Sequence, residues 1–184
     1  MSNWRPDFDP DHLYFVTTTA VHHAHVFRRD VIKRLLLDTL DCMRHQQRLK
    51  LFSFVIMPNH VHLIVQCTAS DSVADVVRDY KHVTADRLVR QLEAEDNPSA
   101  LAFLASQVTR PTRQHHKVWE DDYNAKEVVS PGFLQQKMTY IHNNPCQPHW
   151  NLSSSPEAYI WSSARFYASD ARCIIPVDDA RDLL

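Results

Sequence analysis

The chain has 184 residues, of which 44% are hydrophobic and 23% charged, so it is long enough for one globular domain with a sizeable core. The net charge of −2 excludes attraction to nucleic acid through overall charge, and any DNA contact has to come from local basic patches. Gly132 is the single glycine, which excludes the Gly-rich phosphate loops of nucleotide-binding folds. We expect one domain over residues 1–184, with a core over about 12–145 and a C-terminal extension over about 146–184.

The N-terminal residues have neither a basic start nor an apolar stretch, and no run approaches the ~18 apolar residues that a membrane span requires. The cysteines lie far apart and form no Cys-x-x-Cys pair; they are Cys42, Cys67, Cys146 and Cys173. This usage is typical of reduced thiols. The sequence therefore predicts a cytoplasmic protein that makes no membrane contact.

Runs of β-formers and stripes of apolar residues at helical spacing predict five elements in the first half of the chain. These are a strand over 12–19, a helix over 29–47, strands over 51–57 and 60–66, and a helix from Asp71 or Ser72 to about 92. Asp30 is the expected cap of the first helix. Pro58 and Asn59 predict a tight turn, so the second and third strands form a hairpin.

The second half begins with an irregular stretch over 93–117 that contains a short helix near 101–107. A fourth strand is expected within 118–128, and Ser130-Pro131 predicts the start of a helix that stops near Asn144-Pro145. The tail over 150–184 is irregular, with an aromatic cluster. This element order favours an α+β fold, a ferredoxin-like (RRM-like) antiparallel sheet with helices packed on one face.

His60 and His62 stand two residues apart in an apolar run. Side chains alternate along a strand, so both imidazoles share one face while Val61 and Leu63 take the other. Two neighbouring imidazoles on a rigid element suit the binding of one metal ion. The alternative is a half-buried strand that carries two histidines by chance.

Tyr140 and Asn144 stand four residues apart on a predicted helix and therefore lie on one face. If that helix packs beside the two histidines, Tyr140 is a candidate nucleophile, and the Asn144 amide oxygen can complete the coordination of a metal. Two imidazoles, an amide oxygen and open positions suit Mg²⁺ or Mn²⁺, whereas zinc prefers a more closed site. The alternative for Tyr140 is an ordinary tyrosine at a packing interface.

Three segments together resemble the REP-associated tyrosine transposases, which belong to the single-tyrosine HUH transposase superfamily. The segments are Pro58-Asn59-His60-Val61-His62 with its apolar flanks, Lys137-x-x-Tyr140-Ile141-His142-Asn143-Asn144-Pro145, and Tyr159-x-Trp161-Ser162-Ser163-Ala164. The resemblance implies His60, His62 and Asn144 as ligands of a divalent metal and Tyr140 as the nucleophile. It also implies single-stranded DNA hairpins as substrates and a 5′-phosphotyrosine intermediate. One departure is the acidic run over 120–122, where relatives tend to be basic or aromatic.

Lys81 is the first candidate for DNA contact because Tyr80-Lys81-x-x-Thr84 resembles the family at that position. Arg78, Arg113 and Lys117 are further candidates, and the alternative for each is a solvated surface charge. The expected partner is a single-stranded DNA hairpin, and a monomer is favoured over a dimer.

The combined prediction is a metal-dependent DNA transposase that cleaves and rejoins single-stranded DNA at hairpins. Two alternatives stay open. One is a catalytically inactive protein that binds DNA hairpins, and the other is an HUH endonuclease of the replication or conjugation type.

Overall fold

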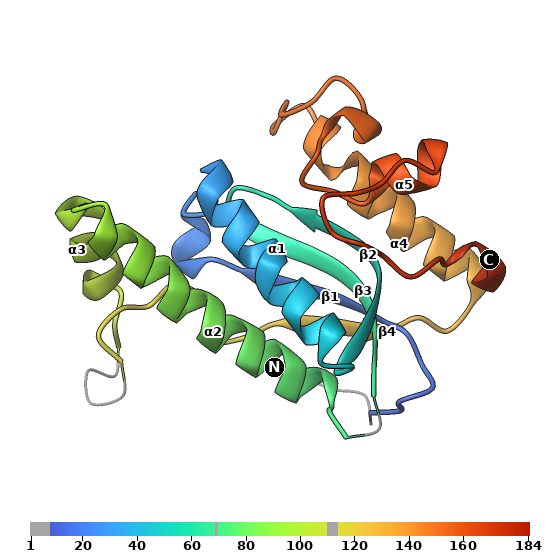
Figure 1. The fold of residues 1–184 in the computed structure, drawn as a ribbon, viewed down its shortest axis with the longest axis horizontal. Helices are drawn as coiled ribbons and strands as arrows, with labels where there is room; N and C mark the ends of the chain where they lie inside the picture. The colour runs from blue at the N-terminus through green and yellow to red at the C-terminus, as the bar shows by residue number, and fades with distance from the viewer. Residues whose placement is uncertain (1–7, 69, 110–113) are drawn as a thin grey trace.

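The fold is built on an antiparallel sheet in the part of the chain that the computed structural model describes, residues 8–68, 70–109 and 114–184 (Figure 1). Its strands are β1 (Tyr14–Thr19), β2 (Leu49–Ile56), β3 (His60–Cys67) and β4 (Asn124–Glu127), in the order β2-β3-β1-β4. The predicted α+β fold with an antiparallel sheet is confirmed. The fourth strand is shorter than the interval in which it was expected.

The strand register shows which residues of β1 and β2 lie beside the two histidines of β3. In β1, Thr17 lies opposite His62 and Thr19 lies opposite His60, while Val55 of β2 flanks His62 on the other side. The predicted turn between β2 and β3 is confirmed, since the amide of Met57 donates to the carbonyl of His60 at 2.8 Å. Directly opposed residues share a face, so Thr17, Val55 and His62 all point to the same side of the sheet.

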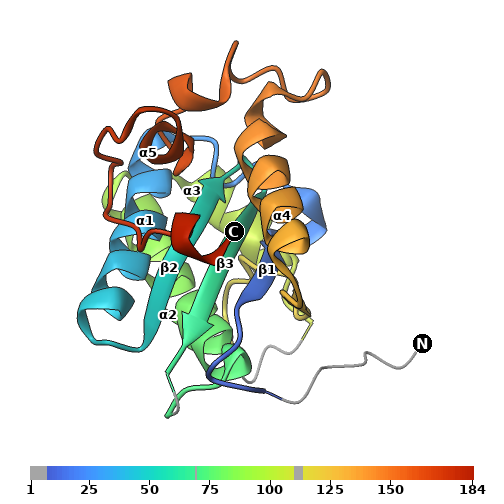
Figure 2. The ribbon, with the colours of Figure 1, turned by 90° about the vertical axis from the view of Figure 1, so that its right-hand side faces the viewer.

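Helices lie on both sides of the sheet. They are α1 (Asp30–His45), α2 (Val73–Ala94), α3 (Pro98–Ser106), α4 (Pro131–Asn143) and α5 (Ala164–Ser169), with short 3₁₀ turns over Val21–His23, Asn144–Cys146, Pro156–Ala158 and Arg181–Leu183. The helices α1 and α2 pack together on one face, as expected. The expectation that the helices pack on one face is wrong for α4, which contacts β2 and β3 and lies on the side opposite α1 (Figure 2). The site described below forms under α4.

Local sequence signals explain where two of these helices begin. Ser72 and Asp75 form a capping box at the start of α2, and the Ser130 hydroxyl accepts from the amide of Phe133 at the start of α4. The expectation that Asp30 caps α1 is wrong, because Arg29 occupies the cap position without a side-chain hydrogen bond. Asp30 instead lies in the first turn, where its carboxylate faces the positive end of the helix dipole.

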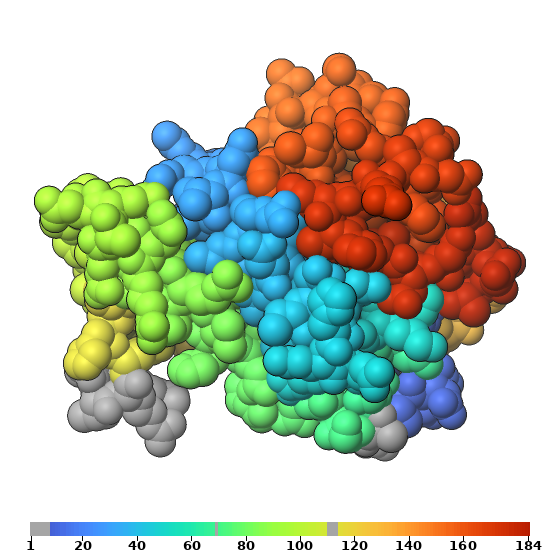
Figure 3. Space-filling view, viewed as in Figure 1, coloured from blue at the N-terminus to red at the C-terminus, as the bar shows by residue number. Residues whose placement is uncertain are grey.

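The C-terminal segment pairs with the outer edge of β2. The amide of Ile56 donates to the carbonyl of Trp161 at 2.9 Å, and the Tyr159 hydroxyl donates to the carbonyl of Ile56 at 2.8 Å. Farther along, the Tyr167 hydroxyl donates to the carbonyl of Phe52 at 2.6 Å. An open strand edge is a template for unwanted pairing, and this segment covers it. Figure 3 shows the same segment, in red, lying against α1.

No helix in the described ranges is long and apolar enough to cross a bilayer. The division into a core over 12–145 and an extension over 146–184 stays a prediction.

Candidate functional site

His60 and His62 project side by side from β3 toward α4, with their ring centroids 4.6 Å apart. His62 is only 4% exposed, and His60 is half-buried at the start of the strand. The alternation of side chains along a strand produces this placement directly. The predicted pairing of the two imidazoles on one face is therefore what the structure contains.

Asn59 orients the His60 ring. Its amide nitrogen donates to the carbonyl of His23 at 3.0 Å, which turns its amide oxygen toward His60. That oxygen lies 2.6 Å from His60 Nδ1 and, being an acceptor, requires a proton on Nδ1. The other ring nitrogen, Nε2, is left with a free lone pair, the arrangement found in histidines that bind metals.

Thr17 also holds the His62 ring, with its hydroxyl 2.8 Å from Nδ1. When this hydroxyl accepts from Nδ1–H, the lone pair of the ring is on Nε2. His62 Nε2 and Asn144 Oδ1 are both buried, and neither meets the geometry of a hydrogen bond within the described part of the chain, although the Asn144 amide lies close enough to His60 to affect its pKa. Unpartnered buried acceptors are rare because desolvation without a compensating bond is unfavourable. Two of them lie in one site, so both atoms are available to a ligand.

Burial keeps both imidazoles neutral. Desolvation lowers the pKa of His60 to about 4, with a smaller opposing effect from the Asn144 amide and further lowering from His23 and His149. Desolvation also lowers the pKa of His62 to about 3, helped by the charges of His60 and Lys137. At neutral pH both rings therefore carry lone pairs that can bind a cation.

These residues fit a divalent metal ion. The two imidazole nitrogens and the amide oxygen of Asn144 supply a mixed nitrogen and oxygen donor set with room for further ligands. Elsewhere in the described ranges, no three His, Cys, Asp or Glu side chains come together to hold a metal. The histidines at 22, 23 and 25 are close together in the sequence, but they form no such group in the described ranges.

Tyr140 lies next to this donor set on the exposed face of α4. Its ring centroid is 5.1 Å from that of His62 and 6.1 Å from that of Phe15, and the residue is 47% exposed. Asn144 caps the same helix one turn later and is 4% exposed. The structure thus brings together four residues predicted from the sequence: His60, His62, Tyr140 and Asn144.

His142 points away from the metal donors, as its spacing from Tyr140 predicts. Its Nε2 lies 3.1 Å from the hydroxyl of Ser53 and 2.9 Å from that of Ser163, so it ties α4 to β2 and to the C-terminal segment. Burial lowers the pKa of His142 to about 4. This histidine is a structural residue rather than part of the candidate site.

We expect His142 to contribute to acid unfolding. The pKa of His142 in the folded state lies below its unfolded value near 6.5. Its contribution to the free energy of unfolding is therefore complete above pH 6.5 and is lost as pH falls toward 4. Between pH 7 and pH 4, the unfolding free energy should therefore fall by roughly 1–3 kcal/mol less in the variant His142→Gln than in the parent protein. Urea unfolding across that range checks this, with the exposed His45→Gln as the control. An unchanged pH dependence in His142→Gln would contradict it.

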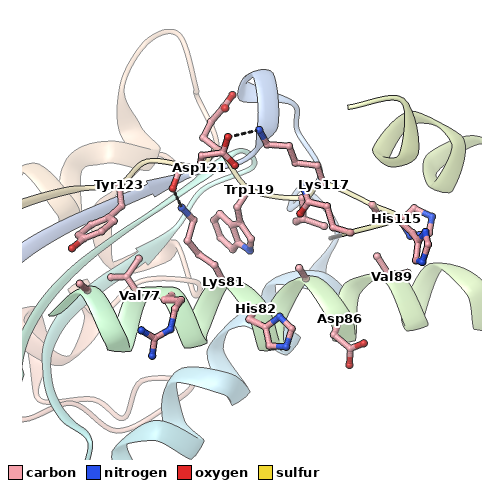
Figure 4. A pocket seen from close by; sticks show the side chains of 17 residues that line it. Val77, Lys81, His82, Asp86, Val89, His115, Lys117, Trp119, Asp121 and Tyr123 are labelled. Carbon is pink, nitrogen blue, oxygen red and sulfur yellow. Dashed lines mark hydrogen bonds and ion pairs between the residues drawn. The ribbon is translucent and has the colours of Figure 1, made fainter. Parts of the chain in front are cut away.

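The predicted DNA contacts lie elsewhere, along α2 on the side of the sheet opposite α4. A cleft of about 780 Å³ runs between α2 and the segment over 114–123, and Arg78, Lys81 and Lys117 line it (Figure 4). The prediction of Arg113 falls outside the described residues. The structure does not bring these cations together with Tyr140.

An acidic turn over 120–122 holds the two lysines of this cleft. Lys81 Nζ donates to the backbone carbonyls of Asp121 and Asp122 at 3.2 and 3.0 Å. Lys117 Nζ pairs with the Asp121 carboxylate at 2.9 Å, and Figure 4 shows both lysines reaching this turn. Burial lowers the pKa of Lys81 to about 8, against the opposing charges of Asp121, Asp122 and Glu120. The cleft is therefore partly neutralised by the chain itself.

Arg78 is also paired, with Asp75 at 2.6 Å and Asp79 at 3.0 Å, on the exposed surface of α2. Exposed pairs of this kind contribute little free energy and exchange readily with other anions.

Sequence reasoning did not identify Thr17 and Asn59 as the residues that orient the two imidazoles. Asn59 directly precedes His60, so its position in the sequence could have indicated a polar side chain close enough to orient that ring. Thr17 could be found only from the register of β1 against β3, which a single sequence does not specify.

Comparison with known proteins identifies the family and the fold. The profile of the family described as "Transposase IS200 like" matches residues 10–144, which confirms the predicted transposase family. The structure of a REP-associated tyrosine transposase bound to a REP hairpin is similar, with a TM-score of 0.62 and 14% identity over 99% of this chain and 94% of that one. That likeness establishes a shared fold.

A crystal structure of a putative transposase from Deinococcus radiodurans R1 aligns with a TM-score of 0.47 and 24% identity, over 78% of this chain and 97% of that one. No curated protein matches the sequence.

Proposed function

Because this chain belongs to the family of IS200-like transposases, we propose that it cleaves and rejoins single-stranded DNA through a 5′-phosphotyrosine intermediate on Tyr140. The observation that carries the proposal is the pair of unpartnered buried acceptors, His62 Nε2 and Asn144 Oδ1, beside the Tyr140 ring. A hairpin-binding protein without catalytic activity has no use for these acceptors. An HUH endonuclease of the replication or conjugation type would also use them, and the match to the transposase family favours the transposase over it.

His60, His62 and Asn144 would hold one divalent cation, Mg²⁺ or Mn²⁺. When bound, such an ion polarises a phosphodiester and neutralises the charge that develops on it. Asn59 and Thr17 keep the Nε2 atoms of the two rings pointed at the site, so the donor set needs little rearrangement on binding. Their exchange for apolar residues would weaken metal affinity.

Tyr140 supplies the nucleophile. Its phenol loses a proton to solvent, its oxygen forms a bond to phosphorus, and the bond from phosphorus to the 3′ oxygen breaks. The departing 3′ oxygen takes up a proton and leaves as a hydroxyl. Because the phosphotyrosine keeps the energy of the broken phosphodiester, a 3′ hydroxyl of another strand end can reverse the step and join strands. The exposure of Tyr140 allows a DNA strand to reach it.

The proposed substrate is single-stranded DNA next to an imperfect hairpin. A solved protein of the same fold is bound to a REP hairpin. In this chain the cleft along α2 offers Lys81 and Lys117 for phosphate contacts, on the side of the sheet away from Tyr140. A hairpin can contact this cleft while its single-stranded flank passes the nucleophile. A monomer remains the expected form.

The test uses a pool of 3′-labelled single-stranded oligonucleotides that share a hairpin and carry randomised flanks. With Mn²⁺ we expect a labelled adduct that keeps its DNA on a denaturing gel, and sequencing of the adduct identifies the substrate. The same pool annealed to its complement should give little adduct. Tight binding of hairpins with no adduct in any divalent metal would instead establish a binding protein without catalytic activity.

The lysines of the cleft and the acidic turn should act in opposite directions on hairpin affinity. Replacing Lys81 with alanine should weaken binding roughly 3- to 10-fold for all hairpin sequences. The slope of the logarithm of the binding constant against the logarithm of the salt concentration should become shallower by about one. Replacing Asp121 with asparagine frees Lys117 and should strengthen binding by a similar factor. Filter binding at several salt concentrations measures both variants.

The exposed Asp38→Asn is the charge-matched control for the acidic variant and should leave affinity almost unchanged. If Lys81→Ala and Asp121→Asn both bind as the parent protein does, the cleft is not a DNA contact.

A further inference from the structure

One lysine stands directly beside Tyr140. Lys137 precedes it by three residues on α4, so the two side chains lie on the same helix face. Lys137 Nζ is 5.0 Å from the ring centroid of Phe15, 5.0 Å from that of Phe133 and 5.8 Å from that of Tyr140. We call these three rings the aromatic cage. They come from β1 and from two turns of α4.

The ammonium in the aromatic cage differs from the other lysines that are not fully exposed. Lys33 pairs with Asp30 at 3.1 Å, Lys117 with Asp121 at 2.9 Å, and Lys81 donates to two carbonyls. Within the described ranges, Lys137 has no carboxylate partner and no hydrogen bond. Aromatic faces attract a cation but accept no conventional hydrogen bond from it, so its N–H donors remain available for an anion.

The ammonium of Lys137 lies close to the place where the phosphodiester has to bind for attack by Tyr140. A phosphodiester attacked by the Tyr140 oxygen lies between that oxygen and the donors of His60 and His62. The ammonium lies beside this space, because its Nζ is 5.8 Å from the centroid of the Tyr140 ring, which in turn is 5.1 Å from that of His62. An ammonium at the edge of the site can contact a non-bridging phosphate oxygen without displacing a metal donor.

We propose that the Lys137 ammonium binds a non-bridging oxygen of the scissile phosphodiester and holds the phosphorus in line with the hydroxyl of Tyr140. The inference deepens the function proposed above and rests on it. The aromatic cage fixes the direction of the long lysine side chain before DNA arrives, which lowers the entropy lost on contact. A preformed positive charge at a developing negative one is the general form of electrostatic catalysis.

The competing explanation is that Lys137 only stabilises the packing of Phe15, Phe133 and Tyr140. Charge separates the two explanations. Methionine at 137 keeps length and apolar contact but removes the charge, and arginine keeps the charge. A packing role predicts that methionine is tolerated, whereas phosphate binding predicts that it is not.

The first experiment tests each variant on a charged and on an uncharged scissile linkage. Single-turnover adduct formation is measured on the natural hairpin DNA and on the same DNA with a neutral methylphosphonate at the scissile linkage. On natural DNA, Lys137→Met should slow adduct formation roughly 10- to 100-fold, and Lys137→Arg should retain most of the rate. On the methylphosphonate, Lys137→Met should differ from the parent protein by less than about 3-fold. Equal losses on both substrates, or no loss on natural DNA, would overturn the proposal.

The second experiment does not depend on cleavage. Proteins carrying Tyr140→Phe, with or without Lys137→Met, are tested for hairpin binding in the absence of metal, and methylphosphonate is placed in turn at each linkage of the flank. With Lys137 present, neutralising one linkage should weaken binding, and with methionine that linkage should have no effect. If every linkage behaves alike in both proteins, Lys137 does not bind the strand. An adduct that fails to form in every protein refutes the proposed chemistry and leaves this binding result to decide the role of Lys137.

Discussion

Replacing Tyr140 with phenylalanine is expected to abolish adduct formation, with a rate at least about 10³-fold below that of the parent protein. The variant loses only the hydroxyl, and phenylalanine keeps the ring against His62 and Phe15. That hydroxyl makes no hydrogen bond within the described ranges, so the melting temperature should stay within about 2 °C. Single-turnover assays on labelled hairpin DNA with Mn²⁺ measure the rate, and filter binding should show hairpin affinity within about 2-fold of the parent.

The matched control is Tyr159→Phe, which removes a buried hydroxyl that donates to the carbonyl of Ile56 at 2.8 Å. It should lower stability by about 1 kcal/mol and leave adduct formation intact. Together the two variants separate loss of a reacting group from loss of stability. Adduct formation by Tyr140→Phe at even a tenth of the parent rate would mean that another group attacks the DNA.

Replacing His62 with alanine is expected to lower the rate of metal-dependent cleavage by roughly 10²- to 10⁴-fold and to remove most of the affinity for Mn²⁺. The ring carries one of the two unpartnered buried acceptors of the site, and Asn144 and His60 alone leave an incomplete donor set. Titration calorimetry with Mn²⁺ measures the affinity without any DNA. Chelation of divalent cations by EDTA should stop cleavage by the parent protein in the same assay.

Two further variants give this prediction its controls. Thr17→Val removes the partner of His62 Nδ1 and should weaken metal affinity about 10- to 100-fold, less than removal of the ring itself. His142→Gln changes a buried histidine on α4 that faces Ser53 and Ser163 instead, and it should bind Mn²⁺ as the parent protein does. Normal Mn²⁺ affinity in His62→Ala would refute the metal site.

Local rules were sufficient for the placement of single side chains. Alternation along a strand put His60 and His62 on one face, and a four-residue spacing put Tyr140 and Asn144 on one face of α4. Turn and capping residues located the β2–β3 hairpin and the starts of α2 and α4. These features depend on neighbours in the sequence, which is why the sequence alone predicted them.

Features that depend on tertiary packing were not predictable in this way. The register of β1 against β3 decides that Thr17 contacts His62, and nothing local to either strand specifies it. The pairing of the C-terminal segment with β2 joins residues about 100 positions apart, as in the bond from Tyr159 to Ile56. The acidic turn over 120–122 was visible as a departure from the family, but its contacts with Lys81 and Lys117 depend on the fold.

The most direct test of the central claim is peptide mapping by mass spectrometry of the adduct formed with hairpin DNA and Mn²⁺. After digestion of the protein and the DNA, the peptide that contains Tyr140 should carry a nucleotide through its 5′ phosphate. The released DNA strand should end in a 3′ hydroxyl. A nucleotide attached to any other residue, or joined through its 3′ phosphate, would contradict the account.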